Sequence, residues 1–337
     1  MIRRGERAAR VQPPPLRHSA AVVHLRIVTP ADRAARVVEL LLASPATSSL
    51  AHLPGASLQP PGDLVLADVA REETSVLVAQ LRELGLEQDG SITLDSSGTV
   101  LADRARDAER FAAGATADAV LWEELESRTS TGAQLSFTFL GLMALATMIA
   151  SVGILTDSLV LIIGAMVVGP EFGPLAGLAV ACVQRRLDLA RRSLLALAVG
   201  FPVAILLAGL GALALRVSGV GPAQLAPISH PETIFISDPN RYSAIVAVLA
   251  GIAGMLALTT THTGALIGVL ISVTTIPAAG NIGVAAAYGE WTEFRGALAQ
   301  LAINLVTILV ACLATLRVQR SVYARRQARA LRRRVPA

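Results

Sequence analysis

A carboxylate lies among glycine and proline residues inside an apolar part of the chain. Two glycines and two prolines surround it in the run Gly169-Pro170-Glu171-Phe172-Gly173-Pro174. Proline removes a backbone donor and glycine permits unwound backbone, so this run predicts a break in a helix. Because an ionisable group at membrane depth is costly, we interpret Glu171 as a candidate for proton coupling or cation binding. The alternative is a carboxylate at the water interface that caps a half-helix.

A second carboxylate, Asp157, lies with Ser158 in a short polar turn. Asp157 and Glu171 are the two carboxylates between Leu135 and Val183. Our first interpretation of Asp157 is a helix cap at the start of the next apolar segment. The alternative places Asp157 and Ser158, with Gly164 further along, on an ion pathway.

A comparable set of polar residues interrupts the apolar sequence further along the chain. It comprises a Thr-rich turn and a second Gly/Pro-interrupted segment, with the candidate pathway residues Thr260, His262, Thr263, Gly268, Thr274, Thr275, Pro277 and Asn281. His262 has an ordinary titration range near neutrality and could relay protons. The alternative is a histidine in a cytoplasmic turn. The small residues in both segments could also serve close helix packing alone.

Six apolar segments must position these residues, and each meets or approaches the roughly 20 residues that a membrane span requires. They run over 135–155, 159–183, 193–217, 242–258, 263–288 and 296–316. Arginines crowd the connection 184–192 and the segment from Arg317 onward. Since short cytoplasmic loops are enriched in basic residues, both segments are predicted to lie inside. We therefore expect both termini in the cytoplasm and the chain in the cytoplasmic membrane.

The apolar region contains an internal repeat. Displacing the chain against itself aligns Ile163 with Ile267 and Arg191 with Arg295. Each half reads as span, polar turn, Gly/Pro-interrupted span, polar loop and span. Because three spans per half turn the second copy upside down, the pattern predicts inverted repeats at 135–217 and 242–316, with a site where the two broken helices meet.

The N-terminal part of the chain alternates predicted strands and helices. Strands are expected at 22–28, 48–53, 63–69 and 91–94, one helix after Thr29 as its cap, a second helix at 72–84, and a Pro/Gly loop at 54–62. The order strand, helix, strand, strand, helix, strand is that of ferredoxin-like domains. Such a domain could be a structural or oligomerising module or a regulatory ligand-binding domain, since the fold alone assigns no function.

The predicted fold class is an α-helical polytopic membrane protein of about six spans, in two inverted three-span repeats with broken second helices, plus an N-terminal α+β ferredoxin-like domain. The first residues lack the apolar core of a signal peptide, so we expect that domain to stay in the cytoplasm. The predicted parts are an N-terminal arm at 1–21, the ferredoxin-like domain at 22–101, a charged connecting helix at 102–134, the transmembrane domain at 135–316 and a basic cytoplasmic tail at 317–337.

Composition argues against several classes of function. All basic residues other than histidine are Arg, and they cluster beside apolar spans rather than among exposed aromatics, so anionic lipid headgroups are the expected partner and nucleic acid is not. Cys182 and Cys312 have no metal-ligand spacing, so we expect no metal and no other cofactor. An intramembrane enzyme lacks support because no nucleophile and base stand out. A homo-oligomer is compatible with the sequence.

The stretch Ala150 to Leu178, together with Thr263 to Val284, resembles the DUF389 family of uncharacterised hydrophobic bacterial membrane proteins. The resemblance covers roughly 135–316 and implies a polytopic membrane domain without naming a substrate. In this family the position of Gly169 is commonly Ser and that of Glu171 commonly apolar, so a role for Glu171 would belong to a subgroup. The leading hypothesis is a transporter or channel for a small solute or ion, regulated by the cytoplasmic domain; the alternative is a membrane-anchored sensor or oligomeric scaffold without transport.

Overall fold

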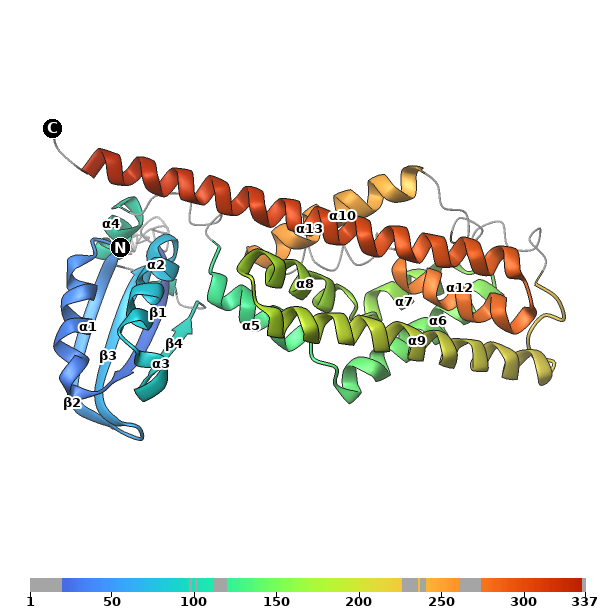
Figure 1. Cartoon of the computed structure of the whole chain (residues 1–337), viewed down its shortest axis with the longest axis horizontal. Helices are drawn as coiled ribbons and strands as arrows, with labels where there is room; N and C mark the ends of the chain where they lie inside the picture. The colour runs from blue at the N-terminus through green and yellow to red at the C-terminus, as the bar shows by residue number, and fades with distance from the viewer. Residues whose placement is uncertain are drawn as a thin grey trace, which may run out of the picture. The chain divides into compact units, whose positions relative to one another are not determined.

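The computed structural model describes residues 20–96, 99–100, 102–111, 120–225, 236, 241–260 and 274–334 (Figure 1). The chain divides into two compact units, Met1–Thr116 and Ala117–Ala337. The first unit is a small antiparallel sheet with helices, and the second is built from helices.

The sheet of the first unit has the strand order β2-β3-β1-β4, and all of these neighbours are antiparallel. A short strand, β5, also pairs with β1. The elements along the chain are β1 Ala20–Thr29, α1 Ala31–Ala43, β2 Thr47–Leu58, β3 Pro61–Ala70, α2 Arg71–Glu83, α3 Leu86–Asp89, β4 Ser91–Asp95, β5 Thr99–Val100 and α4 Asp103–Phe111. The predicted order of four strands and two main helices is thus present, with α3, β5 and α4 added to it.

Apolar faces hold this unit together. Val37 and Leu41 of α1 are fully buried, and so is Leu81 of α2. Their spacing follows the helical period, so each helix turns one apolar stripe toward the sheet. At the centre of the sheet Leu25 of β1 is buried opposite Ala67 of β3.

Two local predictions in this unit were wrong. The expected loop at 54–62 is mostly strand, because a register shift between Leu53 and Ser57 lets β2 accommodate Gly55 at a φ of 63° and continue to Leu58. The expected cap at Thr29 is absent, since Pro30 occupies the N-cap position of α1 and no side chain caps it. Thr29 instead ends β1, and its hydroxyl donates to the carbonyl of Pro30.

The hairpin of β2 and β3 is fastened by Asp63. Its carboxylate accepts the backbone N–H of Gly55 at 2.8 Å and contacts the His52 ring nitrogen at 2.7 Å. The Gly55 N–H, and then the His52 side chain, hold the pKa of Asp63 below its ordinary value of 3.8. A carboxyl group whose pKa is lowered by folding stabilises the fold above its unfolded pKa, and this contribution is lost as the pH falls through the folded pKa.

We therefore expect acidification below about pH 4 to loosen the hairpin, because protonated Asp63 loses the charge that these two contacts favour. Hydrogen exchange of the segment around Gly55 in the whole protein, corrected for the intrinsic pH dependence, should rise in this range. Asp63→Asn should exchange faster at neutral pH and show a flatter pH profile. An unchanged profile in that variant would assign the acid sensitivity to another group.

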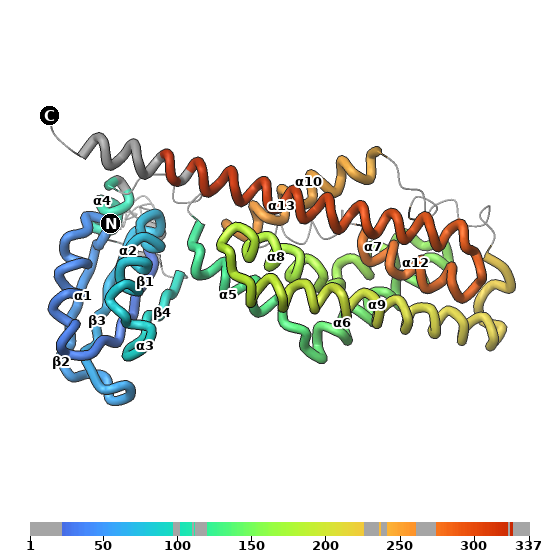
Figure 2. The backbone as a smooth tube through the Cα atoms, viewed as in Figure 1, coloured from blue at the N-terminus to red at the C-terminus, as the bar shows by residue number. Residues whose placement is uncertain are grey.

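The second unit consists of helices that lie side by side (Figure 2). Their bounds are α5 Trp122–Gly132, α6 Phe137–Leu155, α7 Leu159–Val168, α8 Phe172–Gln184, α9 Leu187–Val217, α10 Arg241–Thr259, α12 Thr275–Tyr288 and α13 Trp291–Arg334. Four of them, α6, α9, α10 and α13, are long and apolar enough to cross a membrane, and α7 with α8 makes a fifth candidate if this pair, bent by 47°, is one span. By length and composition, these helices are therefore of the kind found in membrane proteins.

Several expected boundaries differ from those observed. The helix α13 continues from the predicted span 296–316 through the basic segment to Arg334, and α9 begins at Leu187, before the predicted span 193–217. The charged segment 102–134 contains two helices, α4 in the first unit and α5 in the second. The structure describes the predicted span 263–288 only from Thr274 onward. The prediction of six spans therefore rests in part on residues outside the described ones.

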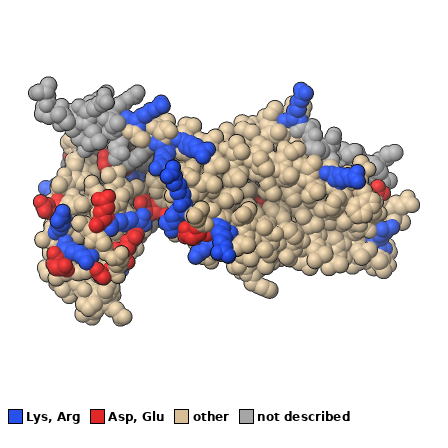
Figure 3. Space-filling view, in the orientation of Figure 1, with Lys and Arg blue, Asp and Glu red and all other residues tan. Residues whose placement is uncertain are grey.

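The helices of this unit pack closely through small residues. Helix α12 contacts α6, α9 and α13, and α8 contacts α5, α9 and α13. Where α12 crosses α9, a Cβ added at Gly283 would lie 2.7 Å from the backbone nitrogen of Gly209. In the face shown in Figure 3, mostly uncharged side chains cover the middle of the bundle.

Candidate functional site

Glu171 lies at the break between α7 and α8, with its side chain inside the protein. The residue is 2% exposed, and the hydroxyl of Thr275 donates a hydrogen bond to its Oε1 at 2.6 Å. Its other oxygen, Oε2, is buried and has no hydrogen-bond partner among the described residues. Although Glu171 occupies the N-cap position of α8, its side chain makes no capping bond. The side chain therefore bridges to α12 instead of capping its own helix.

The Gly/Pro run creates the space for this carboxylate. A Cβ at Gly169 would lie 2.4 Å from Oε2 of Glu171 and 2.6 Å from Cγ1 of Ile276, so only glycine fits between the break and α12. Pro174 falls in the first turn of α8, where a backbone N–H has no partner within the helix and its loss costs little. The predicted break is confirmed by the 47° bend between the two helices.

A second polar cluster lies beside this contact along α12 and α13. The hydroxyl of Thr274 accepts from Nδ2 of Asn304 at 2.8 Å and from Nε2 of Gln300 at 3.3 Å. Gln300 also donates to Oδ1 of Asn304, and its own Oε1 is buried without a hydrogen-bond partner among the described residues. Thr274 and Thr275 are neighbours in the chain, so the cluster adjoins the carboxylate of Glu171. Sequence reasoning missed Gln300 and Asn304, whose signal was two amides one helical turn apart in an apolar span.

The other predicted residues of the first half lie away from this contact. Asp157 is half-buried in the turn between α6 and α7 at a φ of 48°, and Ser158, not Asp157, holds the N-cap position of α7. The ten residues of α7 separate this turn from the break, a rise of about 15 Å. Gly164 lies in the middle of α7, where an added Cβ would meet nothing within 4 Å.

The second half contributes further buried residues. Pro277 and Asn281 are buried on α12, and Oδ1 of Asn281 has no hydrogen-bond partner among the described residues. The hydroxyl of Thr260, at the end of α10, donates to the carbonyl of Leu256 at 2.9 Å. His262, Thr263 and Gly268 lie outside the described residues.

The site offers oxygen atoms and one carboxylate. In the described part of the chain, His, Cys, Asp and Glu form no group of three that could hold a metal ion. A single carboxylate with hydroxyl and amide oxygens nearby can take up a proton or coordinate a cation that prefers oxygen ligands. The arrangement therefore supplies oxygen ligands of the kind that a proton or a small cation needs.

Comparison with known proteins agrees with the resemblance seen in the sequence. Residues 166–310, which include Glu171, Thr275 and Asn304, match the family described as a domain of unknown function (DUF389). The chain is also similar to an uncharacterized protein of Methanocaldococcus jannaschii, with 26% identity over 186 residues, or 55% of each chain. It thus spans about half the length of this relative. No solved structure matches the chain.

Proposed function

We propose that this DUF389-domain protein is a transporter or channel for a small solute or ion, and that Glu171 binds the proton or cation that accompanies or forms the cargo. The single observation that carries this proposal is the buried contact between Glu171 and Thr275, at the break of one helix and the start of another. We place the protein in a bacterial cytoplasmic membrane with both termini in the cytoplasm, where the N-terminal unit would regulate it.

The helix bounds support two copies of one three-span unit. Glu171 and Thr275 are 104 residues apart, and the same separation joins the first and last residues of α6, Phe137 and Leu155, to those of α10, Arg241 and Thr259. It also joins the first residues of α9 and α13, Leu187 and Trp291. The residues after α8 and α12, Arg185 and Gly289, are corresponding positions and both have left-handed backbone.

The packing of the helices supports the same relation. If the two halves are copies, α6 corresponds to α10, α8 to α12 and α9 to α13. The contacts α8–α9, α8–α13 and α6–α9 in one half then correspond to α12–α13, α12–α9 and α10–α13. All six contacts are present. Helix α6 additionally packs on α12. Since an odd number of spans inverts the second copy, six spans in two inverted repeats follow as part of the proposal.

Glu171 and Thr275 then have a special place in this arrangement. Two copies related by a twofold axis bring a residue against its own counterpart only where that residue lies close to the axis. Glu171 and Thr275 are counterparts in the repeat and share a hydrogen bond of 2.6 Å. In transporters built from inverted repeats, the substrate and coupling-ion sites lie at the repeat interface near the bilayer midplane, where discontinuous helices meet. This is the position that Glu171 would occupy.

The competing proposal is a sensor or scaffold in which nothing crosses. It is favoured by the dry, close packing of α12, where a Cβ at Gly280 would lie 3.0 Å from that of Ala150. The two proposals differ in whether water and solutes reach the contact between the two halves.

Cysteine accessibility separates the two proposals without knowledge of the solute. In a background of Cys182→Ser and Cys312→Ala, we expect Thr275→Cys in proteoliposomes to react with a small hydrophilic thiol reagent, because a transport cycle must open the Glu171 site to water. Ala146→Cys, fully buried on α6, is the matched control and should remain inert. A panel of ions and small solutes can then be screened for the member that slows the reaction and is carried across the vesicle membrane. If Thr275→Cys is as inert as the control from both sides, the scaffold is the better description.

A further inference from the structure

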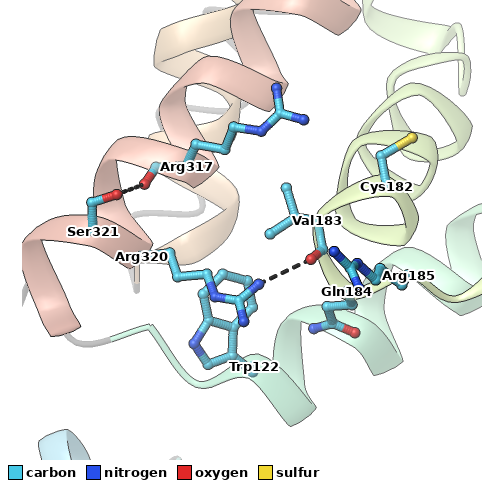
Figure 4. A pocket seen from close by; sticks show the side chains of 8 residues that line it. All are labelled: Trp122, Cys182, Val183, Gln184, Arg185, Arg317, Arg320 and Ser321. Atoms are coloured by element: carbon cyan, nitrogen blue, oxygen red, sulfur yellow. Dashed lines mark hydrogen bonds between the residues drawn. The ribbon is translucent and has the colours of Figure 1, made fainter.

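Three arginines line a cavity at the end of the helical unit where α8 ends and α9 begins. The cavity has a volume of about 750 Å³, and it is lined by Trp122, Cys182, Val183, Gln184, Arg185, Arg317, Arg320 and Ser321. Figure 4 shows Arg317, Arg320 and Ser321 on α13 opposite the last residues of α8. This lining contains no carboxylate, so the cavity is strongly basic.

Neighbouring ion pairs leave two of these arginines available. Arg186 takes the nearby carboxylates, at 2.7 Å from Glu126 and 3.3 Å from Asp188. Arg320 donates from Nη1 to the carbonyl of Val183 at 3.0 Å, which ties α13 to the end of α8. Arg185 and Arg317 have no ion pair within the described part of the chain and are exposed. Their guanidinium groups remain free to bind an anion.

Arg185 forms the turn that ends α8, where the N–H of Arg186 donates to the carbonyl of Ala181 at 3.0 Å. Arg185 adopts the left-handed conformation, with a φ of 59°, a region that glycine occupies at much lower cost than arginine. At the corresponding position after α12 the chain has Gly289, with a φ of 77°. Left-handed residues commonly end helices, so what distinguishes this turn is the choice of arginine, whose backbone cost Arg185→Gly would remove.

The surroundings of the cavity fit the level of lipid headgroups. Leu187 and Val318 lie next to the basic residues in the chain and are 84% and 61% exposed. Trp122, at the start of α5, contributes the type of side chain that is enriched at membrane interfaces. Guanidinium groups match the oxygens of a phosphate with two parallel hydrogen bonds, and basic pockets between membrane helices bind phosphate-bearing headgroups.

We propose that this cavity binds a phosphate group, that of an anionic phospholipid, through Arg185 and Arg317. Gln184 supplies a neutral donor at its rim, the hydroxyl of Ser321 donates to the carbonyl of Arg317, and Arg320 holds the two walls together. The lipid would thereby bridge the end of α8 to α13.

The test compares the double variant Arg185→Gly and Arg317→Gln with the matched double variant Arg191→Gln and Arg192→Gln, which removes the same charge from exposed positions on α9. Binding of phosphatidylglycerol and phosphatidylcholine to the full-length protein is measured by native mass spectrometry. Wild type should bind one phosphatidylglycerol saturably and phosphatidylcholine more weakly. The cavity variant should lose affinity for phosphatidylglycerol about tenfold or more, and the α9 variant should not.

The melting temperature without lipid distinguishes lipid binding by Arg185 from a purely structural role of this residue. Arg185→Gly relieves the left-handed backbone, so the single variant should be at least as stable as wild type without lipid while binding it more weakly. As a variant that leaves both arginines in place, Ser321→Glu should also weaken binding, because it puts a carboxylate into the cavity.

A separate arm titrates inorganic phosphate alone. Phosphate could stabilise wild type, but not the cavity variant, at concentrations where phosphatidylglycerol has no effect. This result would support the site and assign it to a soluble phosphate compound. Undiminished phosphatidylglycerol binding by the cavity variant, or an equal loss in the α9 variant, would overturn the proposal.

Discussion

Replacing Glu171 by Gln should leave a folded, inserted protein whose activity no longer depends on pH or on the coupling cation. Glutamine keeps the shape of the side chain, and its carbonyl oxygen can still accept the hydroxyl of Thr275, which lies 2.6 Å from the carboxylate. The free energy of unfolding should therefore change by about 1 kcal/mol or less, since one hydrogen bond replaces another. What the variant loses is the ability to carry a negative charge or a titratable proton at the meeting point of the two halves.

The rate of thiol modification at Thr275→Cys provides a measurement that needs no identified solute. The thiolate is the form of cysteine that reacts, so each rate is divided by the rate of a freely accessible cysteine at the same pH. With Glu171 present, we expect this corrected rate to change with pH or with the coupling cation, because occupancy of the carboxylate shifts the protein between open and closed forms. With Glu171→Gln the corrected rate should become independent of both. Asp157→Asn is the matched control, as it removes the other carboxylate of this segment at a turn separated from the site by α7. A pH profile that survives Glu171→Gln but not Asp157→Asn would transfer the coupling role to the turn.

The break and the contact could be foreseen to different degrees. Gly169, Pro170 and Pro174 predict a break from local rules alone, because each acts on the backbone of its own segment. That Glu171 faces Thr275 could be expected only through the repeat, which is a statement about the whole chain. Gln300 and Asn304 could not be recognised from the sequence, because two amides in an Ala- and Leu-rich span are not unusual. Their role is visible only once the fold brings both of them to the hydroxyl of Thr274 at the start of α12.

The error at 54–62 in the first unit and the helical conformation of the basic tail both show the limits of local sequence rules. The residues of the 54–62 segment favour turns, yet pairing with β3 carries most of them into a strand through one irregularity at Gly55. The basic segment after Arg317 was interpreted as a tail because its charge excludes it from the membrane. Arginine is nonetheless a good helix former, so leaving the apolar region does not end α13. Charge and turn propensity alone therefore did not determine the secondary structure of these segments.

Gly283→Ala should destabilise the helical unit by about 1–3 kcal/mol, the usual cost of forcing an extra methyl group into a well-packed interior. The added Cβ would lie 2.7 Å from the backbone nitrogen of Gly209 and 2.8 Å from the carbonyl oxygen of Ile205. Both atoms belong to the backbone of α9, which cannot move aside as a flexible side chain could. Helices α9 and α12 must therefore separate, and the protein in detergent should melt at a lower temperature.

Gly141→Ala is the matched control, because an added Cβ there, in α6, meets nothing within 4 Å. Alanine is preferred over glycine in a helix by up to about 1 kcal/mol, so this variant should be as stable as wild type or slightly more so. Equal melting of the two variants would show that α9 and α12 do not approach so closely.

Since α9 belongs to the first proposed repeat and α12 to the second, Gly283→Ala also alters the interface where the two halves would move. If the halves rock against each other, this variant should change the modification rate at Thr275→Cys as well as the stability, whereas in a rigid scaffold only the stability should fall.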